Sequence, residues 1–288
     1  MIPSPFDYHA PKTLRKALSL LQEHGGDAKI LAGGHSLIPL MKLRFASPAT
    51  LIDLGGITGL RKVVAGNETI SIGALATHYA VESHRLLKSR CGLLPETAAA
   101  IGDAQVRNRG TVGGSLVHAD PAADWPATML ALNAQLEISG PGGERSVAVG
   151  EFFEDLLTVA IGEDEILTRV RIGTPPDNSG GAYVKMHQSA SGFAICGVAA
   201  QVTLDNGSCA SVGIGVTGVS PVAYRASAAE AALQGGPMNA ETIASAADKA
   251  ADGVEDFQED HHASGDYRAH LARVFTRQAL TRAAERAA

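Results

Sequence analysis

The sequence predicts an α+β protein, and three observations support this fold class. Helical and strand-like segments alternate over the first 57 residues, as they do in a small α/β unit. Residues 174–181 are rich in Pro, Gly, Asn and Ser, which cannot continue a helix or a central strand and therefore mark a boundary. Beyond this boundary, two strand-like runs precede several helical segments, which predicts an antiparallel sheet followed by a helical bundle.

The length and charge of the chain limit its class. For 288 residues we expect packed subdomains, which we place at 1–57, 58–175 and 180–288. The formal net charge of −6 gives neither nucleic acid nor an anionic membrane surface a reason to bind. No segment reaches the roughly 18 to 20 apolar residues of a membrane span, and the N-terminus lacks a basic leader before an apolar run. We therefore expect a soluble, cytoplasmic protein without membrane insertion.

Apolar periodicity gives the elements of the first two subdomains. Helical spacing predicts helices at 14–24, 37–44, 77–88, 93–101 and 124–132. Alternating or short apolar runs predict strands at 29–32, 50–54, 69–73, 135–139 and 166–172. Thr13, Ser36 and Thr77 stand where N-caps are expected, and Gly25 stands where the first helix should end. The stretch from Asp103 to Arg109 is polar and is expected to be a connection.

The C-terminal third contains a hairpin signal. Residues 194–204 and 209–217 are strand-like and are joined through Asp205-Asn206-Gly207, which favours a tight β-turn. Helices are predicted after Pro221, at 225–234, 239–252 and 266–287.

A glycine pair stands between a predicted strand and a predicted helix, in Ala32-Gly33-Gly34-His35-Ser36. Backbone N–H groups in such a turn are not covered by side chains, and they lie at the positive end of the helix dipole, where phosphate binds. The Ser36 hydroxyl and the His35 ring could add hydrogen bonds. One such pair on its own is more often a structural turn than a phosphate site.

A second glycine turn changes this interpretation. Thr111-Val112-Gly113-Gly114-Ser115 follows the polar and basic segment 105–110. Two such turns can enclose opposite sides of one diphosphate, which a single structural turn would not require. Asp124 follows at a distance from which its carboxylate could accept a hydrogen bond from a ribose or ribityl hydroxyl, whereas Asp120 is expected to cap a helix.

A nicotinamide-binding Rossmann domain is the competing interpretation, because Asp53 follows Gly33 at about the spacing of a ribose-binding acid. However, no glycine occurs between Gly34 and Gly55, so the Gly-x-Gly-x-x-Gly spacing is missing. The close helix–strand approach that this spacing allows is therefore not expected, and the Rossmann interpretation is disfavoured.

These motifs resemble those of the medium, FAD-binding subunits of the molybdenum hydroxylases, of the aerobic carbon monoxide dehydrogenase and xanthine dehydrogenase type. The resemblance extends from Phe6-Asp7-Tyr8 to Asp266-Tyr267-Arg268, and its most specific part is the string 105–115 followed by 118–124. It implies a two-subdomain FAD-binding domain of the vanillyl-alcohol-oxidase (PCMH) type. A C-terminal domain of the carbon monoxide dehydrogenase flavoprotein type is expected to follow.

The resemblance also implies a set of residues that contact FAD, and it assigns no catalytic or metal-binding residue to this chain. The expected FAD contacts are Ala32, Gly33, Gly34, His35, Ser36, Leu37, Thr111, Val112, Gly113, Gly114, Ser115, Asp124, Leu167, Lys185 and Phe193. The two turns would hold the diphosphate and ribityl groups. Lys185 is expected near the edge of the flavin ring and Phe193 beside the ring.

The partners implied by the resemblance are a small subunit with two [2Fe–2S] clusters and a large molybdopterin subunit, assembled as a dimer of heterotrimers. This chain would then relay electrons from molybdenum, through the clusters, to FAD and an external acceptor. The substrate, which would be carbon monoxide, a purine or other N-heterocycle, or an aldehyde, would react in the large subunit. The alternative function is a stand-alone FAD-dependent oxidase or dehydrogenase of the same fold, with His35 as a candidate for covalent flavin attachment.

Two residues depart from the family pattern. Ser115 stands where many relatives have asparagine, which keeps a hydrogen-bonding group but shortens its reach. Gly192 stands where the carbon monoxide enzymes usually have an acid before the aromatic residue. This second departure weakens the assignment of carbon monoxide as substrate.

Other noticeable residues are expected to be structural or solvated. Cys91, Cys196 and Cys209 are expected to be buried free thiols, and Trp125 a packing anchor of its helix. The pair His261-His262 is expected in a solvated charged loop. Five arginines of the last predicted helix are expected to form an exposed face: Arg268, Arg273, Arg277, Arg282 and Arg286.

Overall fold

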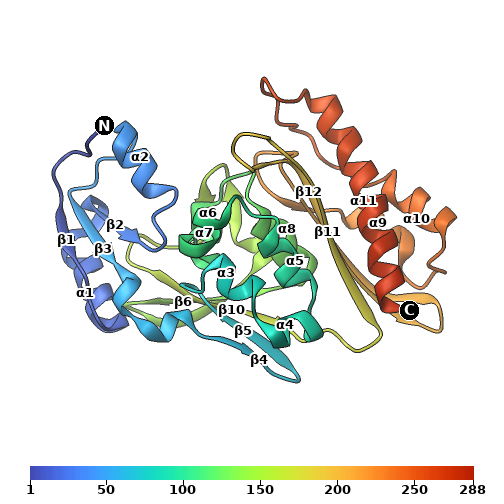
Figure 1. The fold of residues 1–288 in the computed structure, drawn as a ribbon, viewed down its shortest axis with the longest axis horizontal. Coiled ribbons are helices and arrows are strands. Elements are labelled where there is room, and N and C mark those ends of the chain that lie inside the picture. The colour runs from blue at the N-terminus through green and yellow to red at the C-terminus, as the bar shows by residue number, and fades with distance from the viewer.

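Residues 1–288 are described by a computed structural model, in which three groups of elements follow one another along the longest axis (Figure 1). The first group is a parallel sheet of order β1-β3-β2, made of β1 (Asp7–His9), β2 (Ala28–Leu31) and β3 (Thr50–Asp53). Its helices are α1 (Leu14–His24) and α2 (Leu37–Leu43). The Thr13 side chain caps α1 and Gly25 ends it with positive φ, as predicted. Ser36 precedes α2, but its hydroxyl makes no capping hydrogen bond.

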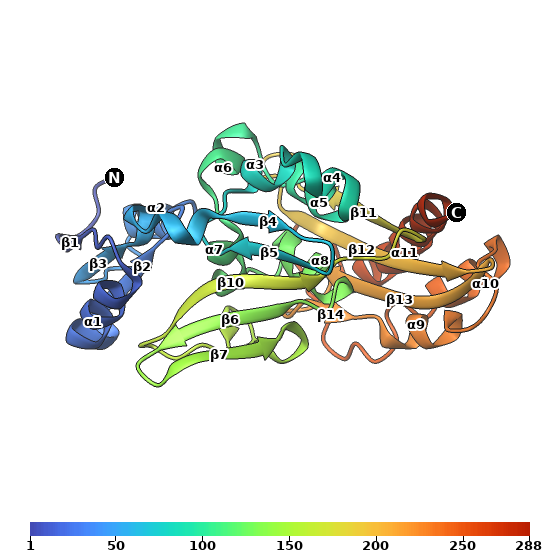
Figure 2. The same ribbon diagram turned by 90° about the horizontal axis from the view of Figure 1, so that it is seen from below.

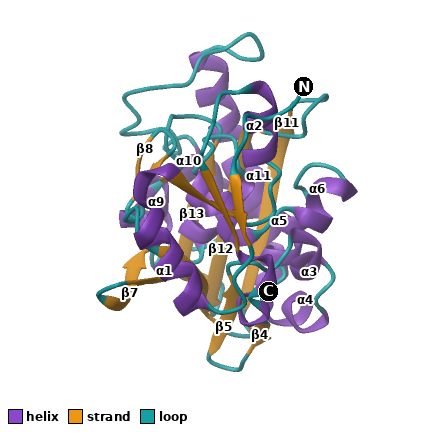
Figure 3. Ribbon diagram, turned by 90° about the vertical axis from the view of Figure 1, so that its left-hand side faces the viewer, coloured by secondary structure: helices purple, strands orange, loops and turns teal.

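The second group contains a five-stranded antiparallel sheet of order β4-β5-β10-β6-β7 (Figure 2). Its strands are β4 (Val63–Ala65), β5 (Thr69–Gly73), β6 (Gln135–Gly140), β7 (Gly143–Ala148) and β10 (Ile166–Gly173). A small hairpin pairs β8 (Phe153–Asp155) with β9 (Thr158–Val159). The helices are α3 (His78–Glu82), α4 (Arg85–Arg90), α5 (Leu93–Ala99), α6 (Ala104–Arg109), α7 (Val112–His118) and α8 (Asp124–Ala131). In Figure 3, α3, α4 and α6 lie along one side of the strands.

Local capping explains where the predicted helices of this group are wrong. The helix predicted at 77–88 is broken into α3 and α4, because the His84 ring accepts a hydrogen bond from the Leu87 N–H and starts a new helix. The polar connection after Asp103 is the helix α6, since the Asp103 carboxylate accepts from the Val106 N–H. The second glycine turn forms the start of α7, which is not among the predicted helices.

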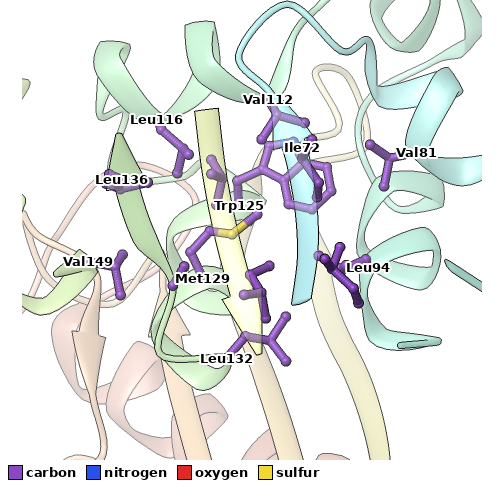
Figure 4. Close-up of a cluster of buried hydrophobic side chains, with 14 of the residues drawn as sticks. Ile72, Val81, Leu94, Val112, Leu116, Trp125, Met129, Leu132, Leu136 and Val149 are labelled. Atoms are coloured by element: carbon purple, nitrogen blue, oxygen red, sulfur yellow. The ribbon is translucent and has the colours of Figure 1, made fainter. Parts of the chain in front are cut away.

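The core of this group surrounds Trp125, which is fully buried on α8 (Figure 4). Ile72 from β5, Leu94 from α5 and Leu116 from α7 contribute to the same cluster. The indole Nε1 donates a 3.0 Å hydrogen bond to Nδ1 of His78, so the polar edge of the ring is satisfied inside the core. The prediction that Trp125 is a packing anchor is therefore confirmed.

The third group is an antiparallel sheet of order β11-β12-β13-β14 with three helices. The strands are β11 (Ser179–His187), β12 (Ala194–Asp205), β13 (Ser208–Thr217) and β14 (Tyr224–Arg225). The helices are α9 (Ser227–Leu233), α10 (Ala240–Ala247) and α11 (Gly265–Ala287). Asn206 and Gly207 both have positive φ in the predicted hairpin turn. The combination of helices and sheets in the three groups confirms the α+β class.

Glycines let helices lie directly on both faces of this sheet. A Cβ on Gly180 would be 2.0 Å from the Ala283 carbonyl oxygen of α11, so this strand and helix are in close contact. On the other face, a Cβ on Gly215 would be 1.9 Å from the carbonyl oxygen of Ala127 in α8. The segment 174–181 is accordingly not all boundary, since β11 already begins at Ser179. No helix of the chain is both long and apolar enough to cross a membrane.

Arg268 contradicts the prediction of an exposed arginine face on the last helix. It is 2% exposed, and its guanidinium donates to the carbonyl oxygens of Ile195 and Gly218 and to Asp260. Arginine at the start of a helix is usually solvated, so sequence periodicity could not reveal a guanidinium that enters the edge of the sheet. Arg273 and Arg277 on the same helix are exposed, as predicted.

Candidate functional site

The two glycine turns lie against each other. A Cβ on Gly33 would be 2.2 Å from the Arg109 carbonyl oxygen and 2.9 Å from Cα of Gly110, so only glycine allows this approach. Ala32 is also in contact with the second turn, because a Cβ on Gly114 would be 3.5 Å from the Ala32 Cβ. The His35 ring is joined to the Gln105 carbonyl oxygen at 2.9 Å. Segments more than 70 residues apart in the sequence therefore form one continuous surface.

The backbone N–H groups of the two turns differ in what they bind. Those of Gly33, Gly34, His35, Ser36 and Leu37 donate to no acceptor within the chain. They lie between the end of β2 and the first turn of α2, where the helix dipole adds positive potential. A run of donors of this kind suits an anionic group such as a diphosphate.

The second turn already uses most of its own donors. The N–H groups of Val112 and Gly113 donate to the carbonyls of Ala76 and Ala74, and those of Gly114 and Ser115 donate to Thr111. The side chain of Val112 is buried in the core, and a Cβ on Gly113 would be 2.5 Å from the Ala74 Cβ. The N–H groups of this turn are therefore not free for a ligand. The turn can contact a ligand through its exposed atoms beside the first turn and through the half-buried Ser115 hydroxyl.

A groove of about 260 Å³ runs between the two turns, with Ala32 and Thr111 in its wall. Two cations, Arg61 and Arg109, and one carboxylate, Asp53, also line it. Gly55, Leu75, Thr77 and Asn108 complete the wall. Most of these residues were not predicted, since single polar residues from different segments meet here only through the fold. Asp53 stands out in the sequence only as a possible ribose-binding acid.

These features fit the phosphate portion of FAD. The free N–H groups and the two arginines offer donors and positive charge, and the glycine at position 33 allows the first turn to approach the main chain of Arg109. The Asp53 carboxylate is held by the Tyr8 hydroxyl and the Gly55 N–H, so it has a fixed position beside the groove. A carboxylate in that position could accept from a sugar hydroxyl.

His78 supports the second turn from behind. Its Nδ1 accepts from Trp125, so its proton lies on Nε2, and a Cβ on Gly110 would be 2.6 Å from that nitrogen. The His78 main-chain N–H also donates to the Gly110 carbonyl oxygen. Burial lowers the pKa of His78 to about 4, with further lowering by His35 and Arg107, so the ring is neutral.

Asp124 and Lys185 form a buried ion pair away from the groove. Their closest atoms are 2.8 Å apart, and the side chains are 5% and 6% exposed. The Tyr183 hydroxyl also donates to Asp124, and the Lys185 ammonium also donates to the Ala100 carbonyl oxygen. Burial raises the pKa of the Asp124 carboxyl, and the contacts with Lys185 and Tyr183 partly offset this. Because Asp124 is occupied by these two donors, it can act on a ligand mainly by orienting Lys185.

The remaining residues predicted to contact FAD, Leu167 and Phe193, are not among those that line the groove. The Leu167 side chain is 4% exposed in the core, so only its main chain could face a ligand. Phe193 is 42% exposed in the loop between β11 and β12, where its N–H donates to the Ser191 hydroxyl. Gly192 in that loop has a φ of 74°, and a Cβ there would be 3.1 Å from Cα of Gly102. Lys185 and Gly192 also line a second cavity of about 570 Å³.

The other residues singled out in the sequence have structural positions. Cys91, Cys196 and Cys209 are buried and free, as predicted. The Asp120 carboxylate accepts from the Ala122 N–H in the turn before α8, and so stabilises that turn without capping the helix itself. His261 and His262 are exposed beside Asp260.

Comparison with known proteins gives matches over the whole chain. Residues 4–175 match the family described as the FAD binding domain in molybdopterin dehydrogenase. Residues 181–283 match the CO dehydrogenase flavoprotein C-terminal domain. The carbon monoxide dehydrogenase medium chain of Hydrogenophaga pseudoflava is 37% identical over 100% of both chains. The 6-hydroxypseudooxynicotine dehydrogenase complex subunit alpha of Paenarthrobacter nicotinovorans is 36% identical over 100% of this chain and 97% of its own.

A solved structure agrees with these matches. A chain of carbon monoxide dehydrogenase from Hydrogenophaga pseudoflava superposes with a TM-score of 0.96 at 40% identity, covering 100% of both chains. Sequence and fold thus agree over the FAD-binding and the C-terminal regions alike. The chain belongs to the family of FAD-binding medium subunits of molybdenum-containing dehydrogenases, to which the carbon monoxide dehydrogenase medium chain also belongs.

Proposed function

We propose that this chain is the FAD-binding electron-transfer subunit of a molybdenum-containing dehydrogenase complex. The observation that carries the proposal is the contact between the two glycine turns, which contribute Ala32 and Thr111 to the wall of one groove together with Arg61 and Arg109. The free N–H groups of residues 33–37 follow Ala32 directly in the chain. When bound, FAD supplies the redox chemistry, so this chain needs no nucleophile or general base of its own.

The residues of this chain would bind and orient the cofactor. The N–H groups of the first turn and the hydroxyls of Ser36 and Ser115 are suited to the diphosphate, with His35 beside them. Lys185 and Phe193 would lie by the flavin ring, with Asp124 fixing Lys185. The subdomains at 1–57 and 58–175 would bind FAD between them, and the domain at 180–288 would complete the ring site.

We propose that the partners are a small subunit with two [2Fe–2S] clusters and a large molybdopterin subunit, in a dimer of heterotrimers in the cytoplasm. Two relatives are named as a medium chain and as a subunit of a dehydrogenase complex, which supports an assembly of this kind. Their names also differ in substrate, which supports a common electron relay behind different oxidation reactions. The Gly192 departure weakens the assignment of carbon monoxide as the substrate, which would in any case react in the large subunit.

The test is purification of the chain from its native source without denaturation. We expect visible flavin absorption, release of unmodified FAD on denaturation, and co-purification of iron–sulfur and molybdenum subunits. Activity of the complex with carbon monoxide, purines and aldehydes would then identify the substrate. A chain that carries no flavin and does not bind added FAD would refute the proposal.

A flavoprotein that purifies alone would instead support the stand-alone oxidase. Mass spectrometry of the denatured chain would then show whether flavin is attached to His35.

A further inference from the structure

The guanidinium of Arg268 joins two strand ends inside the protein. Nη1 donates to the carbonyl oxygens of Ile195 at 2.7 Å and Gly218 at 2.6 Å. Nη2 donates to Asp260 Oδ2 at 2.8 Å. The side chain is 2% exposed, and its Nε–H has no acceptor. Burying a guanidinium with one unpaired N–H costs desolvation free energy. Stabilisation of the fold alone is therefore a poor explanation for an arginine at these two carbonyls.

One of the two carbonyls lies close in the chain to Phe193, which is expected beside the flavin ring, and the other lies against it. Ile195 follows Phe193 by two residues, at the start of β12. Gly218 follows the end of β13 with a φ of 80°, and a Cβ there would be 2.8 Å from the Ile195 carbonyl oxygen. Arg268 therefore fixes the base of the loop that carries Phe193 against the turn after β13.

The same strand ends hold the segment that leads to Asp124. The Ala194 N–H donates to the Ala122 carbonyl oxygen at 3.1 Å, and the Gly218 N–H donates to that of Pro121 at 2.8 Å. The Thr217 hydroxyl lies within hydrogen-bond distance of the carbonyl oxygens of Pro121 and Ala123. All three carbonyls immediately before Asp124 are thus bonded to residues next to the carbonyls that Arg268 binds.

We propose that Arg268 is a positioning residue, which sets the placement of Phe193 and of the Asp124–Lys185 pair relative to the bound flavin. The proposal rests on the proposed function, because these residues matter for redox chemistry only if FAD binds here. Arginine suits the role because its planar fork reaches both carbonyls and Asp260 at once, whereas a lysine ammonium on a flexible stem would lose this fixed geometry.

The test compares Arg268→Lys and Arg268→Met with Arg277→Met in the full-length chain. Arg277 is exposed on the same helix and its side chain makes no hydrogen bond, so its replacement is a matched control. Three quantities are measured: the Kd for FAD, the visible circular dichroism of the bound flavin and its reduction potential. We expect Arg268→Lys to raise the Kd about tenfold and to shift the dichroism and the potential, and Arg277→Met to change none of them.

Thr217→Val provides a second approach if Arg268→Met does not fold. It removes the hydroxyl contacts to Pro121 and Ala123 and leaves the arginine intact. If Arg268 acts through this segment, the effects of Arg268→Lys and Thr217→Val on the Kd are non-additive in the double variant. Strictly additive effects would overturn the proposal, as would a variant with lower thermal stability but unchanged Kd, dichroism and potential. If the wild-type chain itself did not bind FAD, the proposed function would fail, and this inference with it.

Discussion

The carbonyl oxygen of Arg109 fills the space that a side chain on Gly33 would need, at 2.2 Å from the position of a Cβ. Gly33→Ala would therefore force the two glycine turns apart, since the obstacle is main chain and cannot rotate away. We expect a loss of about 1–3 kcal/mol in the free energy of unfolding, as for other overpacked sites. We also expect at least about a tenfold higher Kd for FAD, which corresponds to about 1.4 kcal/mol.

Gly59→Ala is the control for this substitution, because a Cβ on Gly59 would have no neighbour within 4 Å. Urea denaturation and FAD titration of both variants check the prediction. Equal FAD affinity in Gly33→Ala and the wild type would show that contact between the turns is not needed for binding.

His78 is expected to make the protein less stable in mild acid. Its pKa is lowered to about 4 in the folded chain from an ordinary value of 6.5, so between these pH values the unfolded chain binds a proton that the folded chain does not. The contribution is complete above pH 6.5 and is lost as the pH falls towards 4, by about 3 kcal/mol in total. His78→Asn keeps an acceptor for Trp125 but does not titrate, so its free energy of unfolding should fall less over this range. Parallel slopes for the two proteins would contradict the assignment.

The Asp124–Lys185 pair is expected to behave as a buried ion pair. Asp124→Asn would leave the Lys185 ammonium buried without its counter-ion, at a cost of about 3–5 kcal/mol. Lys185→Met should cost a similar amount, because it leaves the Asp124 carboxylate buried without its counter-ion. The double variant should lose less free energy of unfolding than the two single variants added together. Chemical denaturation of the four proteins measures this coupling. Additive losses would mean that the two side chains do not stabilise each other.

The three cysteines are expected to resist thiol reagents in the folded protein. Burial raises the pKa of Cys91 and of Cys196 to about 12, and the Cys209 side chain is also enclosed. A disulfide reagent should therefore modify no thiol at neutral pH until the chain unfolds in denaturant. Rapid labelling of any of the three in the native protein would indicate local opening around it.

Strong local signals explain which parts of the fold could be predicted from the sequence. The helix after Thr13 and the hairpin through Asn206-Gly207 each combine a period with a cap or a turn residue, and both are present. By contrast, α6 and α7 are not among the predicted helices, since both are short and begin through side-chain hydrogen bonds of Asp103 and Thr111. Such helices depend on capping and on packing against distant segments, which periodicity does not record.

The candidate site shows the same division. The glycines of both turns could be found from their spacing, because close approach of main chains demands glycine. Arg61, Thr77 and His78 could not, since they reach the site through contacts between segments far apart in the sequence. The prediction that Arg268 is exposed is wrong because the sequence does not show which acceptors a side chain meets in the fold. Here the acceptors are the carbonyl oxygens of Ile195 and Gly218 at the end of the sheet.

The burial of helix α8 determines how the regions of the chain unfold. All eight of its residues are buried, with Trp125 in the core of the second group and the carbonyl of Ala127 against Gly215 of the C-terminal sheet. The boundary near residue 180 therefore divides the sequence into two regions, but it does not divide the hydrophobic packing, because α8 contacts both regions. Heating should melt the regions on both sides in a single cooperative step, and a fragment ending at residue 175 would expose one side of α8 and aggregate. Changes in the C-terminal third would by the same route alter how firmly the N-terminal regions hold their cofactor.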